Sequence, residues 1–147
     1  MTHTTLITSL ALLTLLISCG KPPRCWQENR NTGDIVANYE LPDCYIAELS
    51  PDDNYVIRSA DDLDTLDNCS PDPLTVDFSQ HSIIGRVVTG QCNLKVIRKL
   101  TIDDTNMEYV YSVTVQECGL CKKLAMDNQL VLVPAIPNNY TIRFVVD

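Results

Sequence analysis

The sequence contains little histidine and few basic residues, and both shortages bear on function. His3 lies in the N-terminal segment before the apolar run, so the rest of the sequence has only His81. A structural zinc site would need a histidine pair or a second C-x-x-C motif besides Cys118–Cys121, and the sequence has neither. Eleven basic residues stand against nineteen acidic ones, and the net charge of −8 disfavours binding to nucleic-acid phosphates. The sequence therefore indicates no metal, no cofactor and no nucleic acid partner.

The sequence also lacks an apolar run long enough to span a membrane. Residues 6–17 are mostly apolar, but a spanning helix needs roughly 20 such residues, and this length is typical of a signal-peptide core. The run ends in Leu16-Ile17-Ser18-Cys19, which resembles the lipobox of bacterial lipoproteins, although residues 1–5 carry no Lys or Arg. The resemblance implies that residues 1–18 are a signal peptide. It also implies that Cys19 becomes an acylated N-terminus, held by membrane lipid in the cell envelope, which we expect to be the outer membrane. The alternative is an ordinary signal peptide with a chance cysteine.

A tether and six further cysteines follow the lipobox. Residues 19–24 include two prolines, which predict an extended spacer. The segment CGLC at Cys118–Cys121 resembles the CGPC of thioredoxins, where the motif opens a long helix. The segment 122–147 after this motif instead has the pattern of two strands, so we interpret the pair as structural. An even number of cysteines predicts disulfides in a compartment outside the cytoplasm, and the residues concerned are Cys25, Cys44, Cys69, Cys92, Cys118 and Cys121.

Alternation of apolar and polar residues predicts a β-hairpin in the second half of the chain. Residues 94–102 and 107–116 both alternate, and turn-forming residues separate them. Placing Ile102 opposite Met107 aligns the apolar faces of both strands. This register puts Cys92 opposite Glu117.

Other patterns define the rest of the predicted domain. Ser59–Asp62 matches a capping box, which predicts a short helix over residues 60–67. The acid-rich run 61–77 lacks the ligand order of a calcium loop. Residues 25–50 are loop-rich, with one or two short strands. Further strands are predicted at 54–58, at 82–89 with a bulge at Gly85, at 129–133 and at 140–146. The sequence thus predicts one mainly β domain over residues 25–147, an antiparallel small sandwich or curled sheet with one short helix and disulfide staples.

The predicted hairpin register leads to a disulfide pairing. Cys25 and Cys44 bracket the poorly patterned N-terminal segment, which suggests a local bridge. The register turns Cys92 and Cys118 to opposite faces, so Cys92–Cys121 is preferred. Cys69 then pairs with Cys118.

Three features from Tyr55 onward are shared with a known family. They are Val76-Asp77-Phe78-Ser79 before a strand, the cysteine-flanked hairpin, and Leu132-Val133-Pro134 followed by a closing strand at Tyr140–Phe144. From Tyr55 to the end, the chain resembles small lipoproteins of Bacteroidetes-type bacteria that are similar to the C-terminal domain of the protease-complex subunit PrcB. The resemblance implies a non-catalytic, protein-associating module and transfers no catalytic residue.

Few residues of the sequence suggest catalysis. His81 adjoins Ser82, but neighbouring side chains of a strand point to opposite faces, and there is no G-x-S-x-G. Nineteen acidic residues leave paired carboxylates open. We expect no enzyme but a lipid-anchored interaction module that docks on another envelope protein. The alternative is a binder of a small molecule or glycan, with Trp26 or tyrosines as a stacking face. Tyr109 and Tyr111 are expected in the core.

Overall fold

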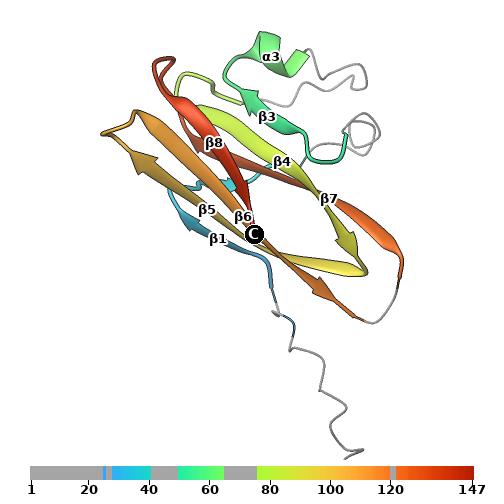
Figure 1. Ribbon diagram of the computed structural model, residues 1–147. Coiled ribbons are helices and arrows are strands. Elements are labelled where there is room, and N and C mark those ends of the chain that lie inside the picture. Colours follow the sequence, from blue (N-terminus) through green and yellow to red (C-terminus); the bar gives the residue numbers. More distant parts are fainter. Residues whose placement is uncertain (1–24, 26–27, 41–49, 65–75, 120–121) are drawn as a thin grey trace, which may run out of the picture.

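The computed structural model describes Cys25 and residues 28–40, 50–64, 76–119 and 122–147 (Figure 1). These described segments form eight strands and one short helix, which are β1 (Arg30–Gly33), β2 (Ala37–Asn38), β3 (Asn54–Ile57), α3 (Ala60–Asp64), β4 (His81–Gln91), β5 (Asn93–Asp103), β6 (Glu108–Cys118), β7 (Leu124–Pro134) and β8 (Thr141–Val146). The predicted fold class, mainly β with one short helix, is confirmed.

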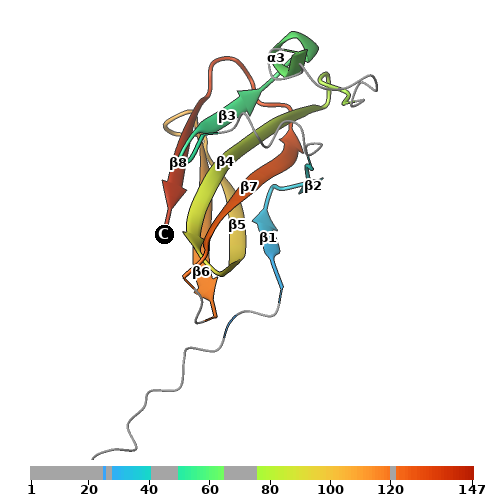
Figure 2. The same cartoon turned by 90° about the vertical axis from the view of Figure 1, so that its right-hand side faces the viewer.

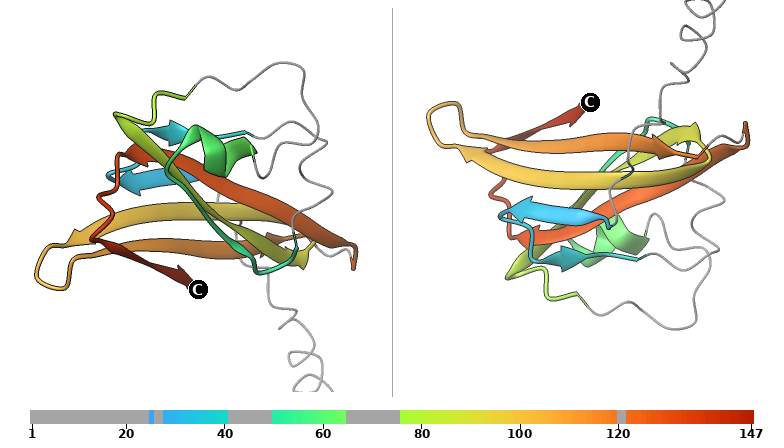
Figure 3. Two further views of the ribbon diagram at one scale, coloured as in Figure 1. Left: turned by 90° about the horizontal axis from the view of Figure 1, so that it is seen from above. Right: turned by 90° about the horizontal axis from the view of Figure 1, so that it is seen from below.

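The strands form two four-stranded sheets that lie face to face, seen from the side in Figure 2 and end-on as two layers in Figure 3. Sheet A has the order β1-β5-β6-β8, and sheet B has the order β2-β7-β4-β3. Neighbouring strands are antiparallel except at both edges of sheet A, where β1 with β5 and β6 with β8 are parallel. The fold is therefore a sandwich, with parallel edge strands that the sequence did not predict.

Apolar side chains fill the space between the two sheets. Tyr109 and Tyr111 lie in this core as predicted, with 6% and 0% of their surfaces exposed. Burying one large apolar side chain contributes about 1.5–3 kcal/mol. The buried members of this cluster are Ile84, Val88, Val96, Leu100, Tyr109, Tyr111, Val113, Val131, Val133 and Ile136.

A second apolar cluster covers the outer face of sheet B. Leu63 of α3 and the half-buried Phe78 pack over this face, against Ile83 and Val87 of β4 and Leu130 of β7. Sheet B is therefore buried on both faces. The outer face of sheet A carries no such cluster among the described residues.

The β5–β6 hairpin forms, but its register differs from the prediction by two residues. Ile102 pairs with Tyr109 instead of Met107. Glu117 faces Leu94 instead of Cys92. A slip of two residues keeps every side chain on its own face of the sheet, so the alternation that predicted the hairpin could not fix the register.

The hairpin loop explains the shift. The Asp103 carboxylate accepts hydrogen bonds from the backbone N–H groups of Thr105 and Asn106, at 3.0 and 3.1 Å. Asp103 consequently ends β5 as the partner of Glu108. Met107 closes the loop with a φ of +50°. The loop therefore lies one residue further along the chain than the sequence indicated.

One other local prediction is wrong, and another extends beyond the described residues. Gly85 is not a bulge, because it pairs regularly with Tyr55 on one side and with Leu130 on the other. A Cβ on Gly85 would lie 2.8 Å from the Leu130 Cα, so the glycine allows close approach of two strands. The helix ends at Asp64 in the described chain, and residues 65–67 of its predicted span lie outside the described residues.

The structure contradicts two of the predicted disulfides. Cys25 is bonded to Cys118, with Cα atoms 5.7 Å apart, so the pairs Cys25–Cys44 and Cys69–Cys118 are wrong. The cause is the parallel pairing of β1 with β5, which was not predicted. This pairing directs the chain before β1 along the start of β5, where Asn93 faces Cys118.

The third predicted disulfide remains a prediction. Cys92 is disulfide-bonded, and its predicted partner Cys121 lies outside the described residues. A Cβ on Gly119 would lie 3.4 Å from the Cys92 sulfur, so the chain leaving β6 passes close to Cys92. The predicted acylation site Cys19 and the two remaining cysteines, Cys44 and Cys69, also lie outside the described residues.

Candidate functional site

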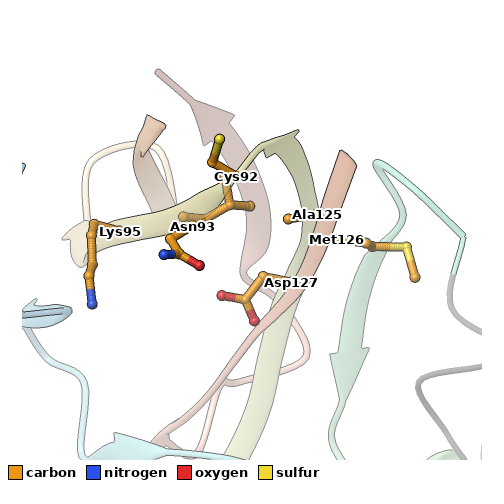
Figure 4. Close-up of a pocket in the computed structure, with 7 residues that line it drawn as sticks. Cys92, Asn93, Lys95, Ala125, Met126 and Asp127 are labelled. Atoms are coloured by element: carbon orange, nitrogen blue, oxygen red, sulfur yellow. The ribbon is translucent and has the colours of Figure 1, made fainter. Parts of the chain in front are cut away.

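An open groove of about 480 Å³ lies where β4 turns into β5, beside the start of β7 (Figure 4). The Asn93 amide of β5 and the Asp127 carboxylate of β7 border the same space, and Lys95 lies two residues further along β5. The lining residues are Cys92, Asn93, Leu94, Lys95, Ala125, Met126 and Asp127. The groove thus offers both hydrogen-bond donors and hydrogen-bond acceptors.

This groove lacks a stacking surface. None of its seven lining residues is aromatic, and Trp26, the side chain expected to stack on a ligand, lies outside the described residues. Tyr109 and Tyr111 are buried in the core. Within the described chain, no three His, Cys, Asp or Glu side chains are grouped so that they could hold a metal ion. Hydrogen bonding is therefore the main chemistry that the groove could supply.

A second depression of about 410 Å³ shares Cys92, Asn93, Ala125 and Met126 with the groove. Lys123 and Leu124 line it, and the Cys92 N–H donates to the Lys123 carbonyl at 2.8 Å. The Leu124 side chain is 70% exposed, the most of any large apolar residue in the described chain. We call this end of the sandwich, with Cys25, Cys92, Cys118, Lys122, Lys123 and Leu124, the cysteine end.

Strand β8 provides a free edge at one side of sheet A. Its one neighbour among the described strands is β6. The N–H groups of Thr141 and Asp147 donate to carbonyls of the β6 side, at 3.0 Å each. Because successive N–H groups of a strand alternate in direction, those of Ile142, Phe144 and Val146 face away from β6. This edge is a template for pairing with another strand.

A positively charged side chain, that of Arg143, lies along this edge on the outer face of sheet A. Arg143, in the middle of β8, contacts the Glu108 carboxylate at 3.0 Å, and its side chain is 55% exposed. A charged residue on an edge strand limits non-specific strand pairing. Arg143 therefore restricts which segments could pair with β8.

Two tyrosines, Tyr109 and Tyr140, pack together at the start of β8. The Tyr140 hydroxyl donates to the Asp104 carboxylate at 3.0 Å, and this hydrogen bond is the main cause that raises the pKa of Tyr140. The Tyr140 and Tyr109 rings meet edge to face, with centroids 5.2 Å apart. These contacts fix the position from which β8 begins.

Strands β1 and β2 are the edge strands on the opposite side of the sandwich. The buried guanidinium of Arg98 donates to the side-chain carbonyls of Asn31 and Asn38, at 3.2 and 3.3 Å. Asn31 lies in β1 and Asn38 in β2, so Arg98 links the edge strands of the two sheets. The sequence alone does not reveal this role, because Arg98 stands in an alternating strand at a position where an apolar residue is expected.

Buried polar groups lie beside Arg98. The Tyr111 hydroxyl donates a hydrogen bond to the backbone carbonyl of Gln129 at 2.7 Å. Burial raises the pKa of Tyr111 well above its usual range. The Gln129 side chain is fully buried, and neither its oxygen nor its nitrogen has a hydrogen-bond partner among the described residues. Unpaired buried polar groups cost about 1–3 kcal/mol each, so this region is stabilised less than the apolar core around it.

His81 and Ser82 are not brought together as a catalytic pair. The Ser82 side chain is 2% exposed, and its hydroxyl oxygen accepts a hydrogen bond from the Ile136 N–H at 3.1 Å. His81 is half-buried at the start of β4, opposite Pro134. The Ser82 hydroxyl therefore has a structural partner of its own.

In comparisons with known proteins, no protein-family model, curated protein or solved structure matches the chain. No helix in the described part of the chain has both the length and the apolar character needed to cross a membrane.

Proposed function

We propose that this chain is a lipid-anchored, non-catalytic module of the bacterial cell envelope that docks a partner protein along the edge of β8. The lipobox-like segment ending at Cys19 supports the anchor. The resemblance to the C-terminal domain of PrcB supports an accessory role. The observation that carries the docking proposal is the free edge of β8.

The edge supplies both the affinity and the geometry for an added strand. Peptide N–H groups and carbonyls face outward from Ile142, Phe144 and Val146, and main-chain hydrogen bonds to such an edge are a common mode of peptide recognition. Val146 is 43% exposed, so a docked strand would also bury apolar surface. The partner is therefore an extended segment of another envelope protein.

Arg143 indicates the chemistry of that segment. Its side chain is 55% exposed while it contacts the Glu108 carboxylate at 3.0 Å. Opposite charges directly across two strands stabilise the pair, and like charges destabilise it. The partner segment should therefore carry an acidic or polar residue opposite Arg143.

A proline placed on β8 tests the docking mode. Val146→Pro removes an N–H that faces away from β6, so the domain should keep its own stability. One lost hydrogen bond together with the steric bulk of the ring should reduce the amount of complex extracted from membranes in mild detergent about tenfold. The measurement is native electrophoresis of the extract beside urea unfolding of the purified protein.

The matched control is Val145→Pro, one residue earlier. Its lost N–H faces β6, so this variant should lose about 1–3 kcal/mol of stability. A complex that survives Val146→Pro would contradict docking at β8. A complex that contains only a second copy of this chain would replace the proposed partner with a homodimer.

The anchor is tested separately with Cys19→Ala. The protein should move from the membrane fraction to the soluble fraction and lose its acyl label. Unchanged membrane binding and acyl labelling in this variant would contradict lipidation of Cys19.

A further inference from the structure

The cysteine end is the part of the domain that is fixed nearest to the proposed anchor. Cys25 follows Cys19 by six positions in the sequence, and six extended residues span at most about 20 Å. The disulfide from Cys25 to Cys118 joins this short tether to the end of β6. Further along the described chain, the Asn29 side chain and β1 also contact β5.

Basic and apolar side chains are exposed around this attachment point. Lys95 and Lys123 line the two depressions that meet at Cys92. Lys122 and Lys123 are exposed and directly precede Leu124, which is 70% exposed. Lysines beside an exposed apolar side chain are the combination that favours contact with a lipid surface.

The acidic residues concentrate elsewhere in the chain. Residues 34–77 hold twelve of the nineteen acidic residues and a single basic one, Arg58. In the described chain, Asp61 and Asp62 lie in α3, and Asp103 and Asp104 lie at the far end of the β5–β6 hairpin. A negatively charged surface would repel this end and attract the lysines.

We infer that the cysteine end faces an anionic lipid bilayer, with Lys95, Lys122 and Lys123 near the headgroups and α3 directed away from the membrane. This orientation rests on the proposed lipidation of Cys19. The tether brings the lysines close to the bilayer, and charge attraction acts over a Debye length of about 8 Å at physiological salt.

Three acidic residues lie near the cysteine end, and they differ in how much they oppose the positive charge of the lysines. The Glu117 carboxylate accepts a hydrogen bond from the Gln91 N–H at 2.8 Å, and Asp127 lies within the groove. Glu28 is exposed close to the attachment point and opposes the attraction. Among the described residues of the cysteine end, Lys122 and Lys123 therefore provide the main exposed positive charge.

Lysine acetylation of the full lipid-anchored protein tests the orientation. The protein is reconstituted in vesicles of phosphatidylcholine alone or of phosphatidylcholine mixed with phosphatidylglycerol, and acetylation of each lysine is followed by mass spectrometry. Lys95, Lys122 and Lys123 should react at least threefold more slowly in the anionic vesicles, and high salt should remove the difference because it screens the attraction. Lys99 lies four residues further along β5 and should react equally in both vesicles, which makes it the internal control.

Three results would separate the inference from the proposed function. Failure of the protein to float with either kind of vesicle would contradict the lipid anchor itself. Flotation with both kinds, but with Lys95, Lys99, Lys122 and Lys123 each acetylated at the same rate in both, would overturn the orientation and leave the anchor standing. The double variant Lys122→Glu, Lys123→Glu should still float and should lose the slower acetylation of Lys95; unchanged protection of Lys95 would also overturn the orientation.

Discussion

The two sheets of this sandwich are built for different surroundings. Strand β4 of sheet B is buried almost without interruption from Ser82 to Gly90, because both of its faces are covered. Strand β6 of sheet A alternates between buried and half-exposed residues, because only its inner face is covered. The difference indicates that sheet B concentrates the stability of the domain, while sheet A leaves an outer face and the β8 edge for contacts with other molecules.

The largest effect should come from truncating the covered face of sheet B. Leu130 is 2% exposed on β7, and Leu130→Ala should lower the free energy of unfolding by about 3 kcal/mol through lost burial and a residual cavity. Leu124 lies on the same strand and the same face but is 70% exposed. Leu124→Ala should therefore cost no more than about 0.5 kcal/mol. Urea denaturation measures both, and equal losses would show that the outer face of sheet B is not a core.

The next largest effect comes from comparing the stability cost of one substitution, Val to Thr, on the outer faces of the two sheets. Val87 of sheet B is 1% exposed, and Val87→Thr would bury a hydroxyl among apolar side chains at a cost of about 1–3 kcal/mol. Val110 of sheet A is half-exposed on the outer face. Val110→Thr should therefore change the stability by no more than about 0.5 kcal/mol. If Val110→Thr is the more harmful change in thermal unfolding, the comparison between the sheets is wrong.

The smallest effect concerns the helix that covers sheet B. The Asp62 carboxylate accepts a hydrogen bond from the Arg58 N–H at 2.9 Å, and this bond is the main cause that lowers the pKa of Asp62. A lowered pKa in the folded state means that the stabilisation is present above the unfolded pKa of about 3.9 and is lost as the pH falls further. Asp62→Asn should cost about 0.5–1 kcal/mol at pH 7. The cost should vanish near pH 2, and a constant cost across this pH range would contradict the assignment.

Strands β5 and β6 could be predicted because alternation reports which face of a strand is buried. The same signal located the inward positions of Tyr109 and Tyr111. It could not fix the hairpin register, since a shift of two residues preserves the alternation. The regular pairing of Gly85 was also beyond the sequence, because a strand glycine is compatible with either a bulge or a close approach of backbones.

The candidate sites could be predicted less well than the fold. The Cys25–Cys118 bond depends on the parallel pairing of β1 with β5, and four exposed residues of β1 give no periodic signal for that pairing. The free edge of β8 likewise follows from the order of strands in the sheet. Arg98 could have been noticed as a charged residue at an inward position of β5, but its partners Asn31 and Asn38 come from a region without a pattern.

Photocrosslinking in native membranes tests most directly whether the edge of sheet A docks a partner. A photoreactive amino acid replaces Thr141 on β8 or, as a control, Thr101 on β5; both residues are exposed in the same sheet. We predict a discrete adduct with another envelope protein from position 141 alone, reduced about tenfold when Val146→Pro is added. Equal adducts from both positions, no adduct from position 141, or an adduct that is unaffected by the proline would contradict docking at β8.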